Sequence, residues 1–418
     1  MSSRRHVRFL LPTAICAAIA VLPPAEATAF GDAVFGPVTV EGNTSTRTDL
    51  ILHEIGFAEG DPFDFAALDA SWEHLEDLGW FAFVDLDYDD GDDGVVPVTI
   101  IVEEDQTTRW YPVIDYDPRW DILLGVRVYD INFRGRGEAL SMSATWYRRH
   151  GYELGWRHPW LFGVDGLSCG IEALWQDAPF EFLDFDFRSF DAGGHLRWEF
   201  RRPFFAEAGL AYRDFRQESA TAELPVVWDA GNRSRLVWRG TLGIDSRDFA
   251  WYPTRGLYDR LTVAYVDRPS FHESYTLLTA DLRGFVPLPW EHVLALRAWG
   301  RRVSGAVWPE DMLFWGGADS IRGYEYASLA GEEGFLLSVE YRWPVFLMPI
   351  SGDGRVIGIG VHAFGDAGAN WWDEDGRGTL YSYGGGAHIN ISDHQFRFEL
   401  AIPTEGDATF QFMDAFNF

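Results

Sequence analysis

From Arg109 onward, apolar and polar residues alternate with a period of two in one segment after another. Within 337–343 the odd positions hold Leu, Val, Tyr and Trp, and the even positions hold Ser, Glu and Arg. Segments 196–201 and 396–400 follow the same rule. Because side chains repeat every two residues along a β-strand, each segment has one apolar, aromatic face and one charged face. The pattern predicts strands, and no helices, throughout residues 109–418.

The last strand indicates where the apolar faces point. Phe410, Phe412, Phe416 and Phe418 project from one face of an extended C-terminal segment. In a soluble sheet this face would form an aggregation-prone edge, whereas a closed membrane barrel places it against lipid and pairs its backbone with the first strand. Alternation alone also fits a soluble sandwich whose charged face looks into water. Because 16% of the residues are aromatic, the composition favours a transmembrane antiparallel β-barrel with a charged, hydrated lumen.

Turn residues divide this region into about sixteen strands, an even number that suits a bacterial barrel with both ends on the periplasmic side. If the first strand starts in the periplasm, the long connections 217–231, 304–333 and 367–378 all lie on the outer side. The connection 304–333 is far longer than the usual connection between strands. We therefore expect it to have a function of its own.

Residues 1–29 have the features of a cleaved secretory signal peptide. Three arginines precede an apolar stretch at 9–22, and small residues at 27–29 suit a signal peptidase. A membrane anchor is the alternative, but the apolar run is shorter than the ~20 residues that a spanning helix requires. Cleavage would remove Cys16 and leave Cys169 alone, so no internal disulfide is expected.

Residues 34–104 differ from the rest of the chain and predict a small α+β domain. A short strand, two amphipathic helices and a hairpin give the order strand, helix, helix, strand, strand. Thr46 or Thr48 can cap the first helix. Few contacts are expected to cross the boundary near 104–106. The second helix carries apolar residues every three or four positions, at Phe65, Leu68, Trp72, Leu75 and Leu78.

The composition argues against several classes of function. The formal net charge of −30 opposes binding to nucleic acid, whose phosphates it would repel. After the leader, no apolar run approaches the ~18 residues of a spanning helix. The 11 His residues show no metal-ligand spacing, so neither zinc nor another metal is expected. We also predict that no cofactor is bound.

Short motifs invite an enzymatic interpretation. Residues 166–170 match the G-x-S-x-G nucleophile motif, and residues 358–363 resemble a glycine-rich dinucleotide fingerprint. Both motifs need a following helix, whereas here the strand pattern continues. Asp85, Asp87 and Asp89 resemble a calcium loop but lack its glycine and its glutamate at the required positions. We therefore predict that the chain has no catalytic residues and is not an enzyme.

Several motifs in a fixed order give the most specific signal. Residues 316–324 read GGADSIRGY and resemble the IRGY/VRGF loop motif of the BamA-type superfamily of outer-membrane proteins, the bacterial surface antigen family. Segments 245–256, 340–344 and 364–368 resemble further barrel motifs of that family, and residues 34–104 resemble one POTRA domain. The resemblance implies a POTRA domain at 34–104, followed by a barrel at 109–418 whose loop 304–333 folds back into the lumen.

The resemblance also implies a set of interacting residues, which we call the loop lock. Arg322 corresponds to the family's loop arginine, with Glu340 and Asp366 as its acidic partners on the barrel wall. An arginine withdrawn from water needs such carboxylate partners. Gly323 would permit a sharp bend at the tip, and Tyr324 completes the motif. The alternative is a surface loop with solvated charges. The family's terminal aromatic is read as an assembly signal, which here would comprise Phe410, Phe412, Phe416 and Phe418.

The resemblance implies a factor for protein assembly, insertion or translocation in the bacterial outer membrane, with its POTRA domain in the periplasm. The POTRA domain would capture unfolded or extended client proteins, or a periplasmic partner, by strand addition. The barrel would deliver clients to the lipid bilayer at the seam between its first and last strands. Such assembly and secretion factors usually carry two or more POTRA domains, whereas this chain has room for one. The alternatives are a passive pore or adhesive surface protein of the same fold and, resting only on the short motifs, an enzyme.

Overall fold

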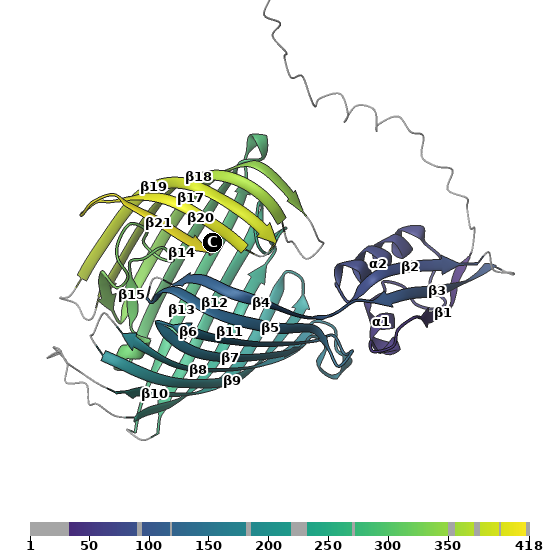
Figure 1. Ribbon diagram of the computed structural model, residues 1–418, viewed down its shortest axis with the longest axis horizontal. Coiled ribbons are helices and arrows are strands. Elements are labelled where there is room, and N and C mark those ends of the chain that lie inside the picture. Colours follow the sequence, from purple (N-terminus) through teal and green to yellow (C-terminus); the bar gives the residue numbers. More distant parts are fainter. Residues whose placement is uncertain are drawn as a thin grey trace, which may run out of the picture.

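The computed structural model describes residues 33–89, 94–117, 119–180, 185–218, 232–269, 272–349, 356–371, 377–392 and 394–414. The described chain forms a small domain with two helices and a large sheet that curves into a barrel (Figure 1). The expected signal peptide at 1–29 lies outside the described residues. No helix among the described residues is long and apolar enough to cross a membrane.

The small N-terminal domain has the predicted order β1 (Val34–Glu41), α1 (Thr48–Glu54), α2 (Phe65–Asp77), β2 (Phe81–Tyr88) and β3 (Val95–Glu104). Its sheet has the order β1-β3-β2, with β1 parallel and β2 antiparallel to β3. The helices pack on one face of this sheet, where Ile51, Leu75 and Ile100 are fully buried. The predicted α+β arrangement is confirmed.

The predicted cap of α1 is wrong, because neither Thr46 nor Thr48 occupies the N-cap position. That position belongs to Arg47, whose side chain makes no capping hydrogen bond. The hydroxyl of Thr46 instead accepts a hydrogen bond of 2.8 Å from Asn132 Nδ2 in the barrel. Local sequence rules assign Thr46 to a helix cap, but in the structure its side chain forms a contact between the two domains.

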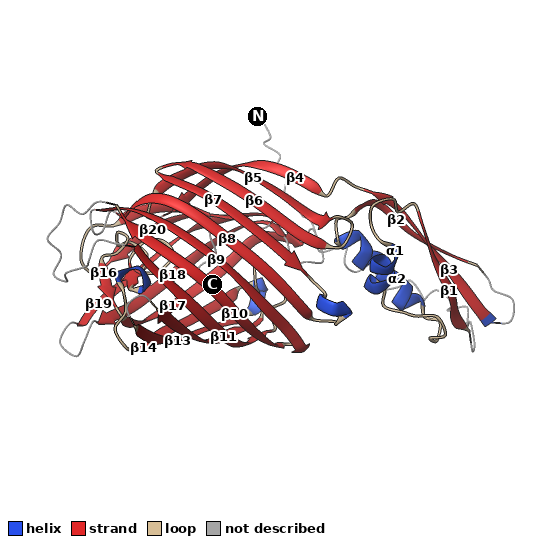
Figure 2. Ribbon diagram, turned by 90° about the horizontal axis from the view of Figure 1, so that it is seen from below, coloured by secondary structure: helices blue, strands red, loops and turns tan. Residues whose placement is uncertain are grey.

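Sixteen antiparallel strands form one sheet, in which each strand pairs with its neighbours along the chain (Figure 1, Figure 2). The predicted number of strands is confirmed. Among the described residues, the short 3-10 helices Leu161–Gly163, Pro289–Glu291 and Pro309–Asp311 lie in connections. The strands of the barrel are β4 (Thr108–Asp117), β5 (Asp121–Phe133), β6 (Glu138–Tyr147), β7 (Arg149–His158), β8 (Leu167–Phe180), β9 (Phe185–Arg201), β10 (Phe204–Gln217), β11 (Asn232–Asp245), β12 (Gly256–Arg268), β13 (Glu273–Pro287), β14 (Val293–Ser304), β17 (Glu333–Pro349), β18 (Val356–Trp371), β19 (Arg377–Ser392), β20 (His394–Pro403) and β21 (Thr409–Asp414).

The alternation in the sequence separates the two faces of the barrel wall. Along β17, Ser338, Glu340 and Arg342 are buried on the inside of the barrel. Leu337 and Trp343, which point the other way, are exposed on the outside. The wall therefore has the predicted apolar exterior and polar interior.

The connection 367–378 is shorter than predicted. β18 continues to Trp371 and pairs there with Arg377, the first residue of β19. Inside the barrel, Asn370 Nδ2 donates hydrogen bonds to the backbone oxygens of Leu313 and Leu329 in the long connection. β18 and β19 are longer than predicted because the connection 305–332 covers the inner face of β18 at Asn370. The turn residues between the two strands give no information about that distant segment.

The two ends of the sheet, β4 and β21, meet at a seam. Their Cα atoms approach within 8 Å, but no backbone ladder joins the two strands in the described part of the chain. Within the described residues, β21 comprises Thr409–Asp414. Among the described residues, the seam is therefore the place in the wall that no backbone ladder closes.

The N-terminal domain contacts the barrel directly at a small number of points. The backbone N–H of Arg47 donates a 3.0 Å hydrogen bond to Gly135 O, in the turn after β5. Trp160 of the barrel packs against the apolar core of the domain. Gly135 has φ +65°, and an added Cβ would lie 1.8 Å from Ser45 O. The contact arises from turns that are distant in sequence, which the boundary alone does not reveal.

Glu104, the last residue of β3, holds the segment that makes this contact. The hydroxyl of Thr44 and the backbone N–H groups of Ser45 and Thr46 all donate to its carboxylate. Burial raises the pKa of Glu104, but these donors outweigh burial and lower the pKa to about 2.

We expect Glu104→Gln to destabilise the domain by about 1 to 2 kcal/mol at neutral pH. Because the pKa is lowered in the folded state, this contribution is present above the ordinary carboxyl pKa of 4.5 and is lost as the pH falls toward 2. Urea unfolding of the domain in both proteins, at neutral pH and near pH 2, measures the difference. Glu103→Gln, at an exposed neighbouring residue, is the control. Equal stability of Glu104→Gln and the parent at neutral pH would refute the expectation.

Candidate functional site

The connection between β14 and β17, residues 305–332, turns back into the barrel (Figure 1). It contains a small hairpin of β15 (Leu313–Trp315) and β16 (Leu329–Gly331). Ile321 is fully buried in a cluster with Leu336 of the wall. An added Cβ at Gly368 of β18 would lie 2.4 Å from Ile321 Cδ1. The loop therefore lies directly against the inner wall.

Arg322 at the tip of this loop is fully buried among carboxylates of three strands. Its Nε and Nη2 bind the two oxygens of Asp366 at 2.7 and 2.8 Å. Its Nη1 lies 2.9 Å from Glu340 Oε2 and 3.3 Å from Glu399 Oε1. The guanidinium also stacks on Phe364, with Cζ 3.5 Å from the ring centroid. Burial lowers the pKa of the Arg322 guanidinium, but the charges of Asp366 and Glu340 outweigh burial and raise it.

The structure brings the predicted loop-lock residues together at the tip. Gly323 has φ +88°, and its N–H donates a 3.2 Å hydrogen bond to Gln411 Oε1 of β21. Tyr324 points toward β19, where its hydroxyl donates to the backbone oxygen of Tyr381 at 3.0 Å. The tip is therefore attached to the side of the barrel that carries the last strands.

Sequence reasoning missed half of the charged network. Glu340 also binds Arg342 Nε at 2.7 Å and Arg397 Nη2, and the same Nη2 lies 2.8 Å from Glu399 Oε1. Three arginines and three carboxylates thus form one buried network, and each side chain is 1% exposed or less. Its members are Arg322, Arg342, Arg397, Glu340, Asp366 and Glu399. The alternation places the missed residues on inward faces. A period of two does not reveal, however, which inward residues meet across strands.

Glu340, His362 and Glu399 place possible metal-ligand atoms within 4.8 Å of one another. Both carboxylates already accept hydrogen bonds from arginines, and His362 Nε2 lies 2.8 Å from Glu399 Oε1. A divalent cation would have to displace guanidinium groups and lie beside their positive charges. The arrangement therefore suits an ion-pair network better than a metal centre.

A chain of hydrogen bonds connects this network to the turn 246–255. His362 Nε2 donates to the Glu399 carboxylate, which can only accept, so in a neutral ring Nδ1 is an acceptor. That Nδ1 lies 3.1 Å from His388 Nδ1, whose Nε2 lies 3.1 Å from the hydroxyl of Tyr252. With both rings neutral, all three hydrogen bonds point from Tyr252 toward Glu399.

The last strand contributes to both faces of the wall. Phe410 and Phe412 point outward, and Phe412 packs on Phe398 of β20 with ring centroids 5.1 Å apart. Between them Gln411 points inward, and its Nε2 donates to Glu399 Oε2 at 2.9 Å. The other two residues of the expected assembly signal, Phe416 and Phe418, lie outside the described residues.

The motifs with an enzymatic appearance lie within strands. Ser168, in the G-x-S-x-G match, belongs to β8, which leads into β9. Residues 358–363 belong to β18, which pairs with β17 and β19. The prediction that a strand, and not a helix, continues through each motif is confirmed.

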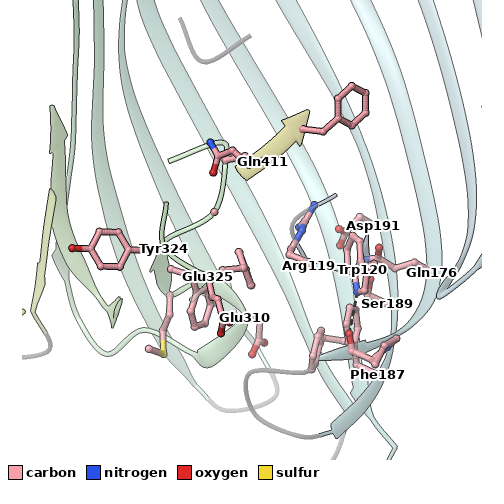
Figure 3. A pocket seen from close by; sticks show the side chains of 18 of the residues that line it. Arg119, Trp120, Gln176, Phe187, Ser189, Asp191, Glu310, Tyr324, Glu325 and Gln411 are labelled. Carbon is pink, nitrogen blue, oxygen red and sulfur yellow. Dashed lines mark hydrogen bonds between the residues drawn. The ribbon is translucent and has the colours of Figure 1, made fainter. Parts of the chain in front are cut away.

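A cavity of about 1010 Å³ separates the loop from part of the wall. Figure 3 shows Gln411 and Tyr324 on one side of it, and Arg119, Asp191 and Gln176 on the other. Aromatic rings and charged groups both contribute to its lining. The cavity therefore reaches from the loop tip and the last strand to the opposite wall.

Comparison with protein families identifies the architecture. Residues 132–418 match the family model described as the Omp85 superfamily domain. The chain belongs to the Omp85 superfamily. Residues 33–105 match the POTRA model, described as a surface antigen variable number repeat. The family predicted from the motifs, with a single POTRA domain, is confirmed.

Two curated relatives carry the name outer membrane protein assembly factor BamA. That of Nitratidesulfovibrio vulgaris is 25% identical over 367 residues, which cover 81% of this chain and 45% of the relative. That of Neisseria meningitidis serogroup B is 23% identical over 385 residues, which cover 80% of this chain and 46% of the relative. The chain therefore spans about half the length of these relatives.

Two solved structures share the fold. BamA from Haemophilus ducreyi lacking POTRA domains 1-3 has a TM-score of 0.71 at 16% identity and covers 91% of this chain and 83% of that one. CdiB from Acinetobacter baumannii has a TM-score of 0.59 at 14% identity, with 91% and 73% covered. The predicted fold class, an outer-membrane β-barrel of sixteen strands preceded by an α+β POTRA domain, is confirmed.

Proposed function

We propose that this chain assembles or translocates proteins at the bacterial outer membrane, with its barrel in the membrane and its POTRA domain in the periplasm. The observation that carries the proposal is the buried network around Arg322, which holds a loop tip beside the seam of the barrel. Gly323 binds Gln411 of the last strand directly. The two curated relatives are named as assembly factors, which supports the same activity here.

The POTRA sheet supports capture of clients by strand addition. β1 and β2 are its edge strands. The outer edge of β1 is partly occupied, because Phe35 N donates to Asp61 O and Phe63 N donates to Ala33 O. In β2, Trp72 Nε1 donates to Val84 O at 2.9 Å. β2 is therefore the less occupied edge, and we propose that it binds an unfolded or extended client, or a periplasmic partner. Main-chain hydrogen bonds would bind such a segment with little dependence on its sequence.

The seam between β4 and β21 is the proposed place where clients enter the lipid bilayer. No ladder joins these strands in the described part of the chain, and an unpaired edge is a template for another strand. The loop lock of Arg322, Gly323, Tyr324, Glu340 and Asp366 would hold the loop against the last strands while no client is present. The network thus stabilises the closed state of the seam.

The proposal involves no covalent chemistry, no catalytic residue and no cofactor. The alternative, a passive pore or surface protein, gives no reason for a fully buried arginine to attach a loop beside the seam. We also propose that the aromatic C-terminal strand is an assembly signal, because Phe410 and Phe412 form its outward face. Unchanged amounts of heat-modifiable, membrane-resident barrel after deletion of Phe418 would refute that role.

Depletion of the chain, followed by quantitative proteomics of outer-membrane and secreted proteins, tests the function. We expect a group of these proteins to decrease, because their assembly or export would depend on the barrel. A passive pore instead predicts steady conductance and an unchanged proteome, and that result would replace the assembly function. Ser168→Ala should complement the depletion fully, whereas an enzyme that uses this serine would lose its activity.

A further inference from the structure

The lumen contains a second charged cluster, made of basic wall residues that are separate from the loop lock. Arginines that are withdrawn from water need acidic partners nearby. The chain supplies many, with 64 Asp and Glu against 34 Lys and Arg. Two members of the cluster, Arg233 and Arg235, have side chains only 6% exposed. The members lie on β10, β11, β12 and β14, and we call them the arginine wall: Arg213, Arg233, Arg235, Arg268 and Arg301.

The partners of the arginine wall come from the 3-10 helix Pro309–Asp311, in the first part of the loop. Glu310 Oε2 lies 3.1 Å from Arg233 Nη1, and Glu310 Oε1 lies 3.0 Å from Arg235 Nη1. Asp311 Oδ1 accepts a 3.2 Å hydrogen bond from Arg235 Nη2. The backbone oxygen of Asp311 accepts from Arg301 Nη1 at 2.7 Å. Two adjacent acidic residues therefore bind arginines of two strands.

Neighbouring residues strengthen this attachment. Arg268 Nη2 donates to Ala306 O at 2.9 Å, and its Cζ lies 4.5 Å from the ring centroid of Trp308. The hydroxyl of Tyr275 donates to the Asp311 carboxylate. Residues 306–311 are thus held by contacts with β11, β12, β13 and β14 before the loop reaches its tip.

The two attachments have opposite charge arrangements and lie on different walls. At the tip, one loop cation binds carboxylates of β17, β18 and β20. At the arginine wall, loop anions bind cations of β11 and its neighbours. The cavity of about 1010 Å³ lies between them, since its lining includes Glu310 and Arg235 as well as Gly323 and Gln411 (Figure 3).

We propose that Glu310 and Asp311 form a second anchor, which holds the first arm of the loop, residues 305–312, across the lumen independently of Arg322. Release of the second anchor would free this arm and widen the cavity, while the tip stays attached beside the seam. The inference goes beyond the proposed function, because it concerns the closed barrel alone and involves no client protein.

The experiment measures thiol labelling at two reporter positions in the purified full-length protein in detergent. Cys169, the one cysteine expected in the mature protein, is replaced by serine. Val307→Cys reports on the first arm, where Val307 packs against the wall, and Ser320→Cys reports on the tip, where Ser320 is buried. The anchor variant combines Glu310→Gln with Asp311→Asn, and Glu325→Gln removes an exposed charge from the same loop as a matched control.

The anchor variant should accelerate labelling at position 307 by about tenfold or more and leave position 320 unchanged within about twofold. Arg322→Ala should give the reverse pattern, and Glu325→Gln should change neither position. If the anchor variant accelerates both positions equally, the loop opens as one unit and the second anchor does not exist as an independent element. No acceleration at 307 would also overturn the proposal.

Loss of heat modifiability would reveal that the anchor variant fails to fold. In that case a substitution on the wall side tests the same contact. Arg235→Gln removes one of the arginines and should accelerate labelling at 307 by a smaller factor. Combining Arg235→Gln with Glu310→Gln should give less than the product of the two single effects, because the pair is already broken. A multiplicative result would show that Glu310 and Arg235 do not hold the arm together. Because no client is present, these outcomes are independent of the depletion experiment.

Discussion

Arg322→Ala should destabilise the barrel by about 3 to 5 kcal/mol, because it leaves buried carboxylates without their partner. The part of the loop beyond the second anchor, from about 313 to 332, should become mobile, whereas most strand content should remain, since the sixteen-strand ladder does not include the loop. Denaturant unfolding and limited proteolysis of the purified barrel measure the two effects. Arg255→Ala, at a side chain that is 75% exposed, is the matched control and should be nearly neutral.

Double substitutions test which carboxylate is the main partner of Arg322. After loss of Arg322, Glu340 keeps Arg342 and Arg397, whereas the side-chain contact that remains for Asp366 among the described residues is Ser338 Oγ at 2.8 Å. Arg322→Ala with Asp366→Ala should therefore be less destabilised than the sum of the single losses, by about 1 to 3 kcal/mol. For Arg322→Ala with Glu340→Ala, the double variant should lie closer to the sum of the two single losses of stability. Glu340→Ala also removes the partner of Arg342 and Arg397. Strict additivity with Asp366→Ala would mean that Arg322 and Asp366 do not form the lock.

Deletion of residues 34–104 should abolish client handling while the barrel still assembles in the membrane. The strands pair with one another without the POTRA domain, so the ladder of the wall is preserved. The deletion also uncovers Trp160 and Ile131, which pack against the core of the domain. We therefore expect a modest loss of barrel stability, about 1 to 3 kcal/mol, in addition to the loss of function.

Complementation of a depletion strain, together with heat modifiability of the barrel, separates these two effects. Glu104→Gln serves as the control, because it weakens the joint but keeps the sheet edge that would bind clients. Full rescue by the truncated barrel would contradict the transport function and favour a passive pore. Failure of the truncated barrel to assemble would instead show that the contact at Trp160 and Gly135 is required for folding.

The sequence predicts the number of barrel strands well because their pattern is local. Alternation with a period of two marks a strand and its inward face, and this face already includes Glu340, Arg342 and Glu399. Contacts between distant segments carry no such mark. The hydroxyl of Thr46 contacts Asn132 instead of capping a helix, and β18 extends to Trp371 under the cover of the loop.

The motif around Arg322 could be recognised only as a resemblance, and the second anchor gave no signal at all. Glu310 and Asp311 stand in a loop, where acidic residues are usually solvated. Their importance depends on Arg233 and Arg235, which precede them by more than seventy residues. Charge pairs of this kind become visible only when the strands are placed side by side.

The hydrogen-bonded chain through His388 and His362 connects a turn at one end of the barrel with the tip of the loop. Tyr252 lies on the turn 246–255, at the end of the barrel that carries the POTRA domain, and it is fully buried. Its hydroxyl begins a sequence of direct contacts that ends at Glu399, which touches Arg322. A displacement of Tyr252 would lengthen or break the first of these contacts, with His388. A path of four hydrogen-bonded side chains, from Tyr252 through His388 and His362 to Glu399, therefore joins the periplasmic turn 246–255 to Arg322 at the tip of the loop.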